Sequence, residues 1–121
     1  MNNNKNLGLR SRTNSFGYAI RGLAQIFREE PNVKLHAIAT VVAIAAGLIR
    51  HISKTEWIAI IIAIGLVWIT ETLNTCIERL CDFACNRQLH PEIKIIKDIA
   101  AGAVLLAAVV SVTIGIIVFF I

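Results

Sequence analysis

The sequence contains 121 residues, of which 56% are apolar and 17% charged, and its mean hydropathy is +0.69. This composition excludes an ordinary soluble domain, because so few charged residues cannot cover the surface of one. The formal net charge of +4 is modest and carries no nucleic-acid footprint, so the basic residues are better explained as determinants of membrane topology. A membrane protein of this length has room for about three spans of roughly 20 residues in a single domain.

The N-terminal part of the chain divides into a polar and an amphipathic segment. Residues 1–14 are polar and contain no apolar core of a cleaved signal peptide, so we predict a disordered cytoplasmic tail. Over residues 15–30 apolar side chains recur with a helical period, while Arg21, Gln25 and Arg28 occupy the other side. We expect this helix to lie in the membrane interface; an ordinary amphipathic packing helix is the alternative.

Three apolar segments follow. Pro31 marks the first boundary, because proline at a first helical position ends one helix and starts the next, and we predict a span over residues 31–49. A short polar connection leads to Trp57, a typical interfacial anchor, and to a second span over 57–84. A polar turn then precedes a third span over 91–121. The sequence therefore predicts an all-α membrane protein with an N-terminal surface helix and three transmembrane helices.

The distribution of Lys and Arg predicts the orientation. Six of these residues precede the uncharged part of the first span, two lie in the first connection and four around the second. Positive charge is retained on the cytoplasmic side, which places the N-terminus and the second connection in the cytoplasm. Glu30, Glu78, Lys97 and Asp98 then share the cytoplasmic side of the membrane.

One face of the second span is polar at its cytoplasmic end. At about 100° per residue, the side chains on this face all fall within an arc of roughly 100°; they are Glu71, Asn74, Thr75, Glu78 and Asp82. Glu71 is the deepest, and a charge at a helix centre in a membrane costs roughly 2.5–3.5 kcal/mol, so such residues are functional candidates. Glu71 could be a general base for a hydroxyl, or a hydrogen-bonded carboxylate that fixes helix register; the residues alone favour neither.

The remaining charged candidates lie nearer the membrane surface. Glu30 and Glu78 carry the hard oxygen ligands that Mg²⁺ prefers, although on its sequence position alone Glu30 is better explained as a solvated residue at a helix end. Lys97 and Asp98 precede the small residues 99–103, which permit close helix approach. Lys97 could hold a phosphate as a point charge; an ion pair or snorkelling to the interface is the alternative.

Several familiar signatures are missing from the sequence. It contains no phosphate-binding loop, protein-kinase signature, serine-centred elbow or zinc-protease motif. The cysteines Cys76, Cys81 and Cys85 are odd in number and fit no self-contained disulfide framework, so we interpret them as small packing residues. The residues alone thus indicate a small cytoplasm-facing membrane site with acids, an amide and a lysine.

Two motifs extend this inference. Glu71-Thr-Leu-Asn-Thr-Cys-Ile-Glu78 followed by Asp82, together with Lys97-Asp-Ile-Ala-Ala-Gly-Ala-Val-Leu105, resembles the bacterial integral-membrane diacylglycerol kinase and undecaprenol kinase family. Gly17-Tyr-Ala-Ile-Arg-Gly-Leu23 is similar to the surface helix of that family. The resemblance covers nearly everything from residue 15 onward and implies a single membrane-embedded lipid kinase domain over residues 15–121. It also implies a homotrimeric bundle with active sites shared between chains, in the bacterial inner (cytoplasmic) membrane.

The same resemblance implies an activity and its central residues. The activity is transfer of the γ-phosphoryl group of ATP, with Mg²⁺, to the hydroxyl of a membrane lipid alcohol. By position, Glu71 takes the hydroxyl proton and Asn74 positions the acceptor and the phosphate, whereas Glu30 and Glu78 hold Mg²⁺. These roles suit phosphoryl transfer, in which catalysis is mainly positioning and charge neutralisation.

The resemblance further implies nucleotide-binding positions, which are Tyr18, His90, Lys97 and Asp98. The chain departs from the family where a basic residue is expected near the start of the surface helix. Ser11 stands there between Arg10 and Arg12, and we take Arg12 as the substitute.

The details of two segments bear on the acceptor. His90-Pro91 and Ala100-Ala-Gly-Ala-Val-Leu105 look more like the undecaprenol kinase branch, so we favour undecaprenol over diacylglycerol. The alternative of a different class is a non-catalytic helical membrane scaffold or ion-pathway protein, in which Glu71 and Lys97 belong to a buried polar network.

Overall fold

The computed structural model describes the backbone of residues 3–121 and the side chains of residues 8–121. The described residues form four helices, α1 (Asn3–Glu29), α2 (Asn32–Arg50), α3 (Lys54–Ala84) and α4 (Pro91–Phe120). Three of them, α2, α3 and α4, are long and apolar enough to cross a membrane. The predicted all-α membrane fold with three spans is therefore confirmed.

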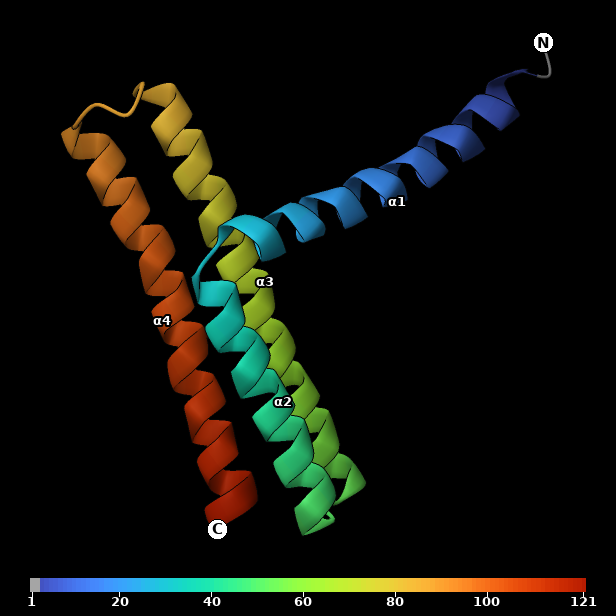
Figure 1. Ribbon diagram of the computed structural model, residues 1–121, viewed down its shortest axis with the longest axis vertical. Coiled ribbons are helices and arrows are strands. Elements are labelled where there is room, and N and C mark those ends of the chain that lie inside the picture. Colours follow the sequence, from blue (N-terminus) through green and yellow to red (C-terminus); the bar gives the residue numbers. More distant parts are fainter. Residues whose placement is uncertain (1–2) are drawn as a thin grey trace.

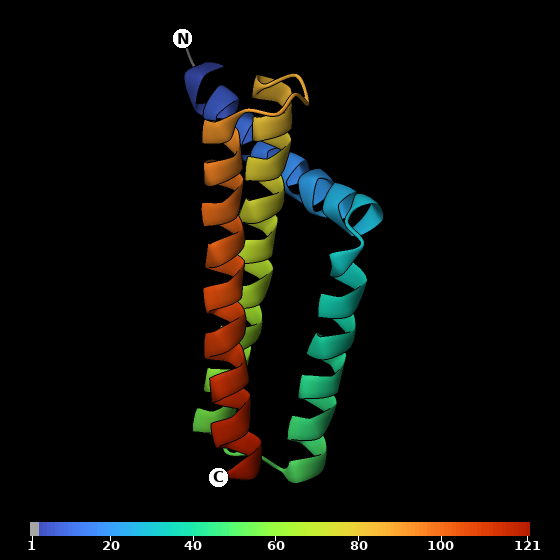
Figure 2. The same ribbon diagram turned by 90° about the vertical axis from the view of Figure 1, so that its left-hand side faces the viewer.

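The spanning helices lie alongside one another, and α1 crosses one end of the bundle and projects away from it (Figure 1). Figure 2 shows α3 and α4 packed along their length, with α2 standing further from them. The α3–α4 connection lies at the same end as α1, whereas the α2–α3 connection and the C-terminus lie at the other end. This arrangement brings the N-terminal helix and the second connection to one side, as the charge distribution predicts.

Helix α1 is longer than predicted, so the disordered tail over residues 1–14 needs correction. Residues 3–14 are helical, and residues 1 and 2 lie outside the described part of the chain. The hydroxyl of Thr13 donates to the carbonyl of Leu9 (2.9 Å), and that of Ser15 donates to the carbonyl of Ser11 (2.8 Å). No proline interrupts the segment, and Leu9 continues the apolar stripe of Phe16, so the helix extends past the predicted boundary.

The other helix boundaries follow local capping rules. Pro31 has φ of −65° and stands immediately before α2. Ser53 and Glu56 form a reciprocal capping box, with two hydrogen bonds of 3.2 Å, and this explains why α3 begins at Lys54 and not at Trp57 as predicted. His90 caps α4 by accepting a hydrogen bond at Nδ1 from the backbone N–H of Glu92 (3.2 Å).

Small side chains allow α3 and α4 to pack closely. Ala63 on α3 and Ala100 and Ala107 on α4 are buried. The Ser111 hydroxyl donates to the carbonyl of Ala63 (3.0 Å), which joins the two helices inside the apolar region. Most large apolar side chains of α2–α4 are instead exposed, as expected of faces that meet lipid or neighbouring chains.

Candidate active site

Three polar side chains of α3 are among the most buried in the described structure. Glu71 is 5% exposed, Asn74 9% and Thr75 2%. Helical spacing places them on one face, as the sequence predicts; His36 of α2 contacts Glu71, and residues of α1 border the same hollow as Thr75. Buried polar groups in a membrane protein are costly, so this cluster is the strongest functional candidate in the fold.

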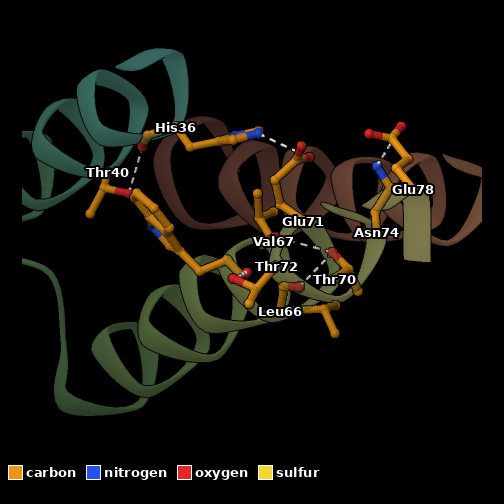
Figure 3. A network of polar contacts seen from close by, with 10 residues as sticks. His36, Thr40, Leu66, Val67, Thr70, Glu71, Thr72, Asn74 and Glu78 are labelled. Atoms are coloured by element: carbon orange, nitrogen blue, oxygen red, sulfur yellow. Dashed lines mark hydrogen bonds and ion pairs between the residues drawn. The ribbon is translucent and has the colours of Figure 1, made fainter. Parts of the chain in front are cut away.

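Glu71 has a partner on another helix. Its Oε2 lies 3.3 Å from Nε2 of His36 on α2, and Figure 3 shows the two side chains facing each other. Two further bonds connect this region: Trp68 Nε1–H donates to Thr40 Oγ1 (2.9 Å), which donates to the carbonyl of His36 (2.7 Å). His36 was not among the predicted site residues. The signal for it in the sequence is a histidine inside an apolar segment.

Asn74 lies between Glu71 and Glu78 in the sequence of α3. Its Nδ2 donates to Glu78 Oε1 over 3.3 Å, as Figure 3 also shows. Among the described side chains, Asn74 Oδ1 and Thr75 Oγ1 are buried without a hydrogen-bond partner. An unpaired buried polar atom costs about 1–3 kcal/mol, so these two oxygens are suited to binding a polar ligand.

The charged residues near the α3–α4 connection form ion pairs. Lys97 Nζ lies 2.5 Å from Asp82 Oδ1 on α3, and Lys94 Nζ lies 2.6 Å from Asp98 Oδ2. Lys97 and Asp98, predicted to act together on the nucleotide, therefore have separate partners in this structure. All four side chains are substantially exposed, so the pairs stabilise the fold little and their charges are available to a ligand.

The space between α1 and α3 forms two adjoining hollows. The first, about 460 Å³, is mainly apolar and borders Thr75; its other lining residues are Ala19, Gly22, Leu23, Gln25, Ile26, Thr72, Cys76 and Arg79. The second, about 590 Å³, is polar and is lined by Gln25, Glu29, Arg79, Asp82, Phe83, Asn86 and Arg87. An ion pair between Arg79 and Glu29 joins the two helices. Arg79 and Arg87 were used in the prediction of topology only, and their place beside the site was not predicted.

Tyr18 belongs to a different surface of α1. It lines a shallow hollow of about 360 Å³ with Arg10, Ser11, Asn14 and Ser15, to which neither Arg12 nor any residue of α2–α4 contributes. The Arg21 guanidinium lies 5.7 Å from the centre of the Tyr18 ring. Of the two arginines that flank Ser11, Arg10 is thus the one that shares a surface with Tyr18.

The predicted metal ligands belong to different elements, because Glu78 lies on α3 and Glu30 follows α1. Glu30 is half-buried at the α1–α2 junction, where its backbone N–H donates to the carbonyl of Ile26 (3.0 Å). Over residues 8–121, no three His, Cys, Asp or Glu side chains are grouped to bind a metal ion. The carboxylates of Glu30 and Glu78, with the unpaired Oδ1 of Asn74, are nevertheless hard oxygen donors of the kind that Mg²⁺ binds, so the residue types fit.

Comparison with known proteins identifies the family. The model of the prokaryotic diacylglycerol kinase family matches residues 17–119. An undecaprenol kinase of Bacillus subtilis is 39% identical over 105 residues, which cover 87% of this chain and 85% of that protein. A diacylglycerol kinase of Synechocystis is 37% identical over 101 residues, which cover 84% of this chain but 58% of that protein. A diacylglycerol kinase of Pseudomonas aeruginosa is 31% identical over 107 residues, covering 88% and 86%. The buried acid-and-amide face and these matches together show that the chain belongs to the prokaryotic diacylglycerol kinase family and is a phosphotransferase with an alcohol acceptor.

Proposed function

We propose that this protein transfers the γ-phosphoryl group of ATP to the hydroxyl of a membrane lipid alcohol, with undecaprenol as the favoured acceptor. The observation that carries the proposal is the buried carboxylate of Glu71, with unpaired oxygens of Asn74 and Thr75 about one helical turn away. The undecaprenol kinase of Bacillus subtilis, which aligns over most of both chains, supports the choice of acceptor.

Glu71 acts as the general base in this proposal. It accepts the proton of the lipid hydroxyl while the lipid oxygen bonds to the γ-phosphorus, and the bond from that phosphorus to the bridging oxygen breaks to release ADP. Thr75 donates through its unpaired hydroxyl to the acceptor oxygen or to the transferred phosphoryl group, whereas the unpaired Oδ1 of Asn74 can only accept and so binds the hydroxyl proton of the acceptor before transfer. The protein contributes mainly position and electrostatic stabilisation, because phosphoryl transfer needs little covalent chemistry from it.

The nucleotide is held by charge at the end of the bundle where α1 and the α3–α4 connection meet. Lys97 exchanges its partner Asp82 for a phosphate of the nucleotide. The nucleotide site is completed by Asp98, His90, Tyr18 and one of the two arginines Arg12 and Arg10. Glu30 and Glu78 hold Mg²⁺, which supplies neutralisation of phosphate charge when bound. ATP is cytoplasmic, so this end of the bundle lies on the cytoplasmic side of a bacterial inner membrane.

A single chain does not complete the site. The hollow beside Tyr18 has no lining residue from α2, α3 or α4, whereas Glu71 and Lys97 lie on α3 and α4. This supports an active site shared between neighbouring chains, and we include in the proposal the homotrimer that the sequence resemblance implies.

The test is a direct assay of lipid phosphorylation. The purified full chain, in mixed micelles with Mg²⁺ and γ-labelled ATP, is given undecaprenol and diacylglycerol side by side. We expect labelled undecaprenyl phosphate to form faster than labelled phosphatidate. Faster phosphorylation of diacylglycerol would overturn the acceptor preference alone. No labelled lipid with any long-chain alcohol would overturn the lipid kinase function.

A further inference from the structure

The side chain that contacts Glu71 has no role in the function proposed above. We propose that His36 is a positioning residue for the general base: its Nε2–H holds Oε2 of Glu71, so that Oε1 is the oxygen turned to the acceptor hydroxyl. The inference rests on the proposed function of Glu71. Its direct basis is the 3.3 Å contact between His36 Nε2 and Glu71 Oε2, made between α2 and α3 by side chains that are 19% and 7% exposed.

The imidazole is held by aromatic packing as well as by Glu71. The rings of His36 and Trp68 meet edge to face, with their centres 6.1 Å apart and an interplanar angle of 62°. Trp68 is fixed in turn by its hydrogen bond to Thr40 and by stacking on Phe27 of α1, with ring centres 5.3 Å apart. Residues of α1, α2 and α3 therefore determine where the imidazole points.

His36 also lines an apolar space. A groove of about 200 Å³ between α2, α3 and α4 is bordered at one end by His36, Thr40 and Trp68. Glu71 does not line this groove. Of the two side chains in this contact, His36 is thus the one that lines the groove, where an acceptor's hydrocarbon chain can lie.

The chemistry of a buried base explains why such a contact matters. A carboxylate has two equivalent oxygens and can rotate about its last bond, so a base without a second contact has no fixed direction. A neutral imidazole that donates through Nε2 holds one oxygen and leaves the negative charge on Glu71. Displacing a reacting group by about 1 Å lowers the rate by roughly 10²-fold, which sets the scale of the expected effect.

Two variants of His36 separate positioning from packing. His36→Leu fills similar space but has no donor, whereas His36→Gln keeps an N–H that reaches toward Glu71. His51→Gln is the matched control, because His51 is an exposed histidine just after α2, at the opposite end of that helix. The measurements are kcat and the KM values for ATP and undecaprenol, using the full chain in mixed micelles.

We expect His36→Leu to lower kcat by about 10- to 100-fold, and the KM for ATP to stay within about twofold of the wild-type value. His36→Gln should recover most of the lost kcat, and His51→Gln should match the wild type. An active wild type with unchanged kcat in His36→Leu would overturn this inference alone. Equal losses of kcat and folded yield in both His36 variants would show a packing role and overturn it as well. A wild type that phosphorylates no lipid alcohol would overturn the proposed function together with it.

Discussion

Replacing Glu71 by glutamine tests the proposed base with little disturbance of its surroundings. Glutamine has nearly the same volume as glutamate, and the site is 5% exposed, so a change of size would be felt there. Its side-chain oxygen can accept the hydrogen bond from His36 that Glu71 Oε2 now accepts at 3.3 Å. The amide cannot take a proton from a lipid hydroxyl. We therefore expect Glu71→Gln to fold and to bind ATP, but not to turn over.

The expected loss of kcat in Glu71→Gln follows from the role of Glu71 as a general base. General base catalysis contributes about 10²- to 10⁴-fold, so kcat should fall by that factor, equivalent to roughly 3–5 kcal/mol in the activation barrier. The stability should change by less than about 1 kcal/mol, because the contact with His36 is kept. Glu71→Leu is the contrasting variant: it leaves the partly buried Nε2 of His36 without this partner and should destabilise the fold by about 1–3 kcal/mol.

Three measurements on the same detergent preparation decide between the roles of Glu71. They are the thermal unfolding midpoint, ATP affinity and kcat with undecaprenol. Turnover near the wild-type rate in Glu71→Gln would remove Glu71 from the base role. Loss of the folded state in Glu71→Gln would instead favour the other interpretation of this residue, a carboxylate that fixes helix register.

Three further changes have defined outcomes. Glu78→Gln removes one proposed Mg²⁺ ligand, so the Mg²⁺ concentration for half-maximal activity should rise about tenfold or more; an unchanged Mg²⁺ titration would argue against ligation. Lys97→Met breaks the exposed ion pair with Asp82 and should change the unfolding midpoint little, since such pairs contribute about 0–1 kcal/mol, but the KM for ATP should rise about tenfold. An unchanged KM for ATP would show that Lys97 does not bind the nucleotide and only pairs with Asp82. Gly47→Ala places a Cβ 2.7 Å from a ring carbon of Trp57 and should destabilise the α2–α3 hairpin by about 1–3 kcal/mol. An unfolding midpoint equal to the wild type would show that the Trp57 ring moves aside freely.

The elements and the polar face of α3 were predictable because they depend on local properties. Apolar segments of sufficient length, with Pro31 and Pro91 at two boundaries, determine where the spanning helices lie. The spacing of Glu71, Asn74 and Thr75 places them on one face of any α-helix, whatever surrounds it. The start of α1 was not predicted, because its first residues form a polar segment without a strong helix signal. The side-chain contacts made within it, such as that of Thr13 with Leu9, are weak.

The sequence by itself thus determined three membrane helices, a surface helix and an acidic stripe beside an amide, and two motifs sufficed to indicate the family. Only the tertiary structure decided which side chains contact the residues of the site. Glu71 meets His36, which lies 35 positions away in the sequence, and Lys97 meets Asp82 and not Asp98. Such pairs depend on how far each helix is rotated about its axis and where it crosses its neighbour. That information lies in the packing of whole faces, and the periodicity of a single segment does not contain it.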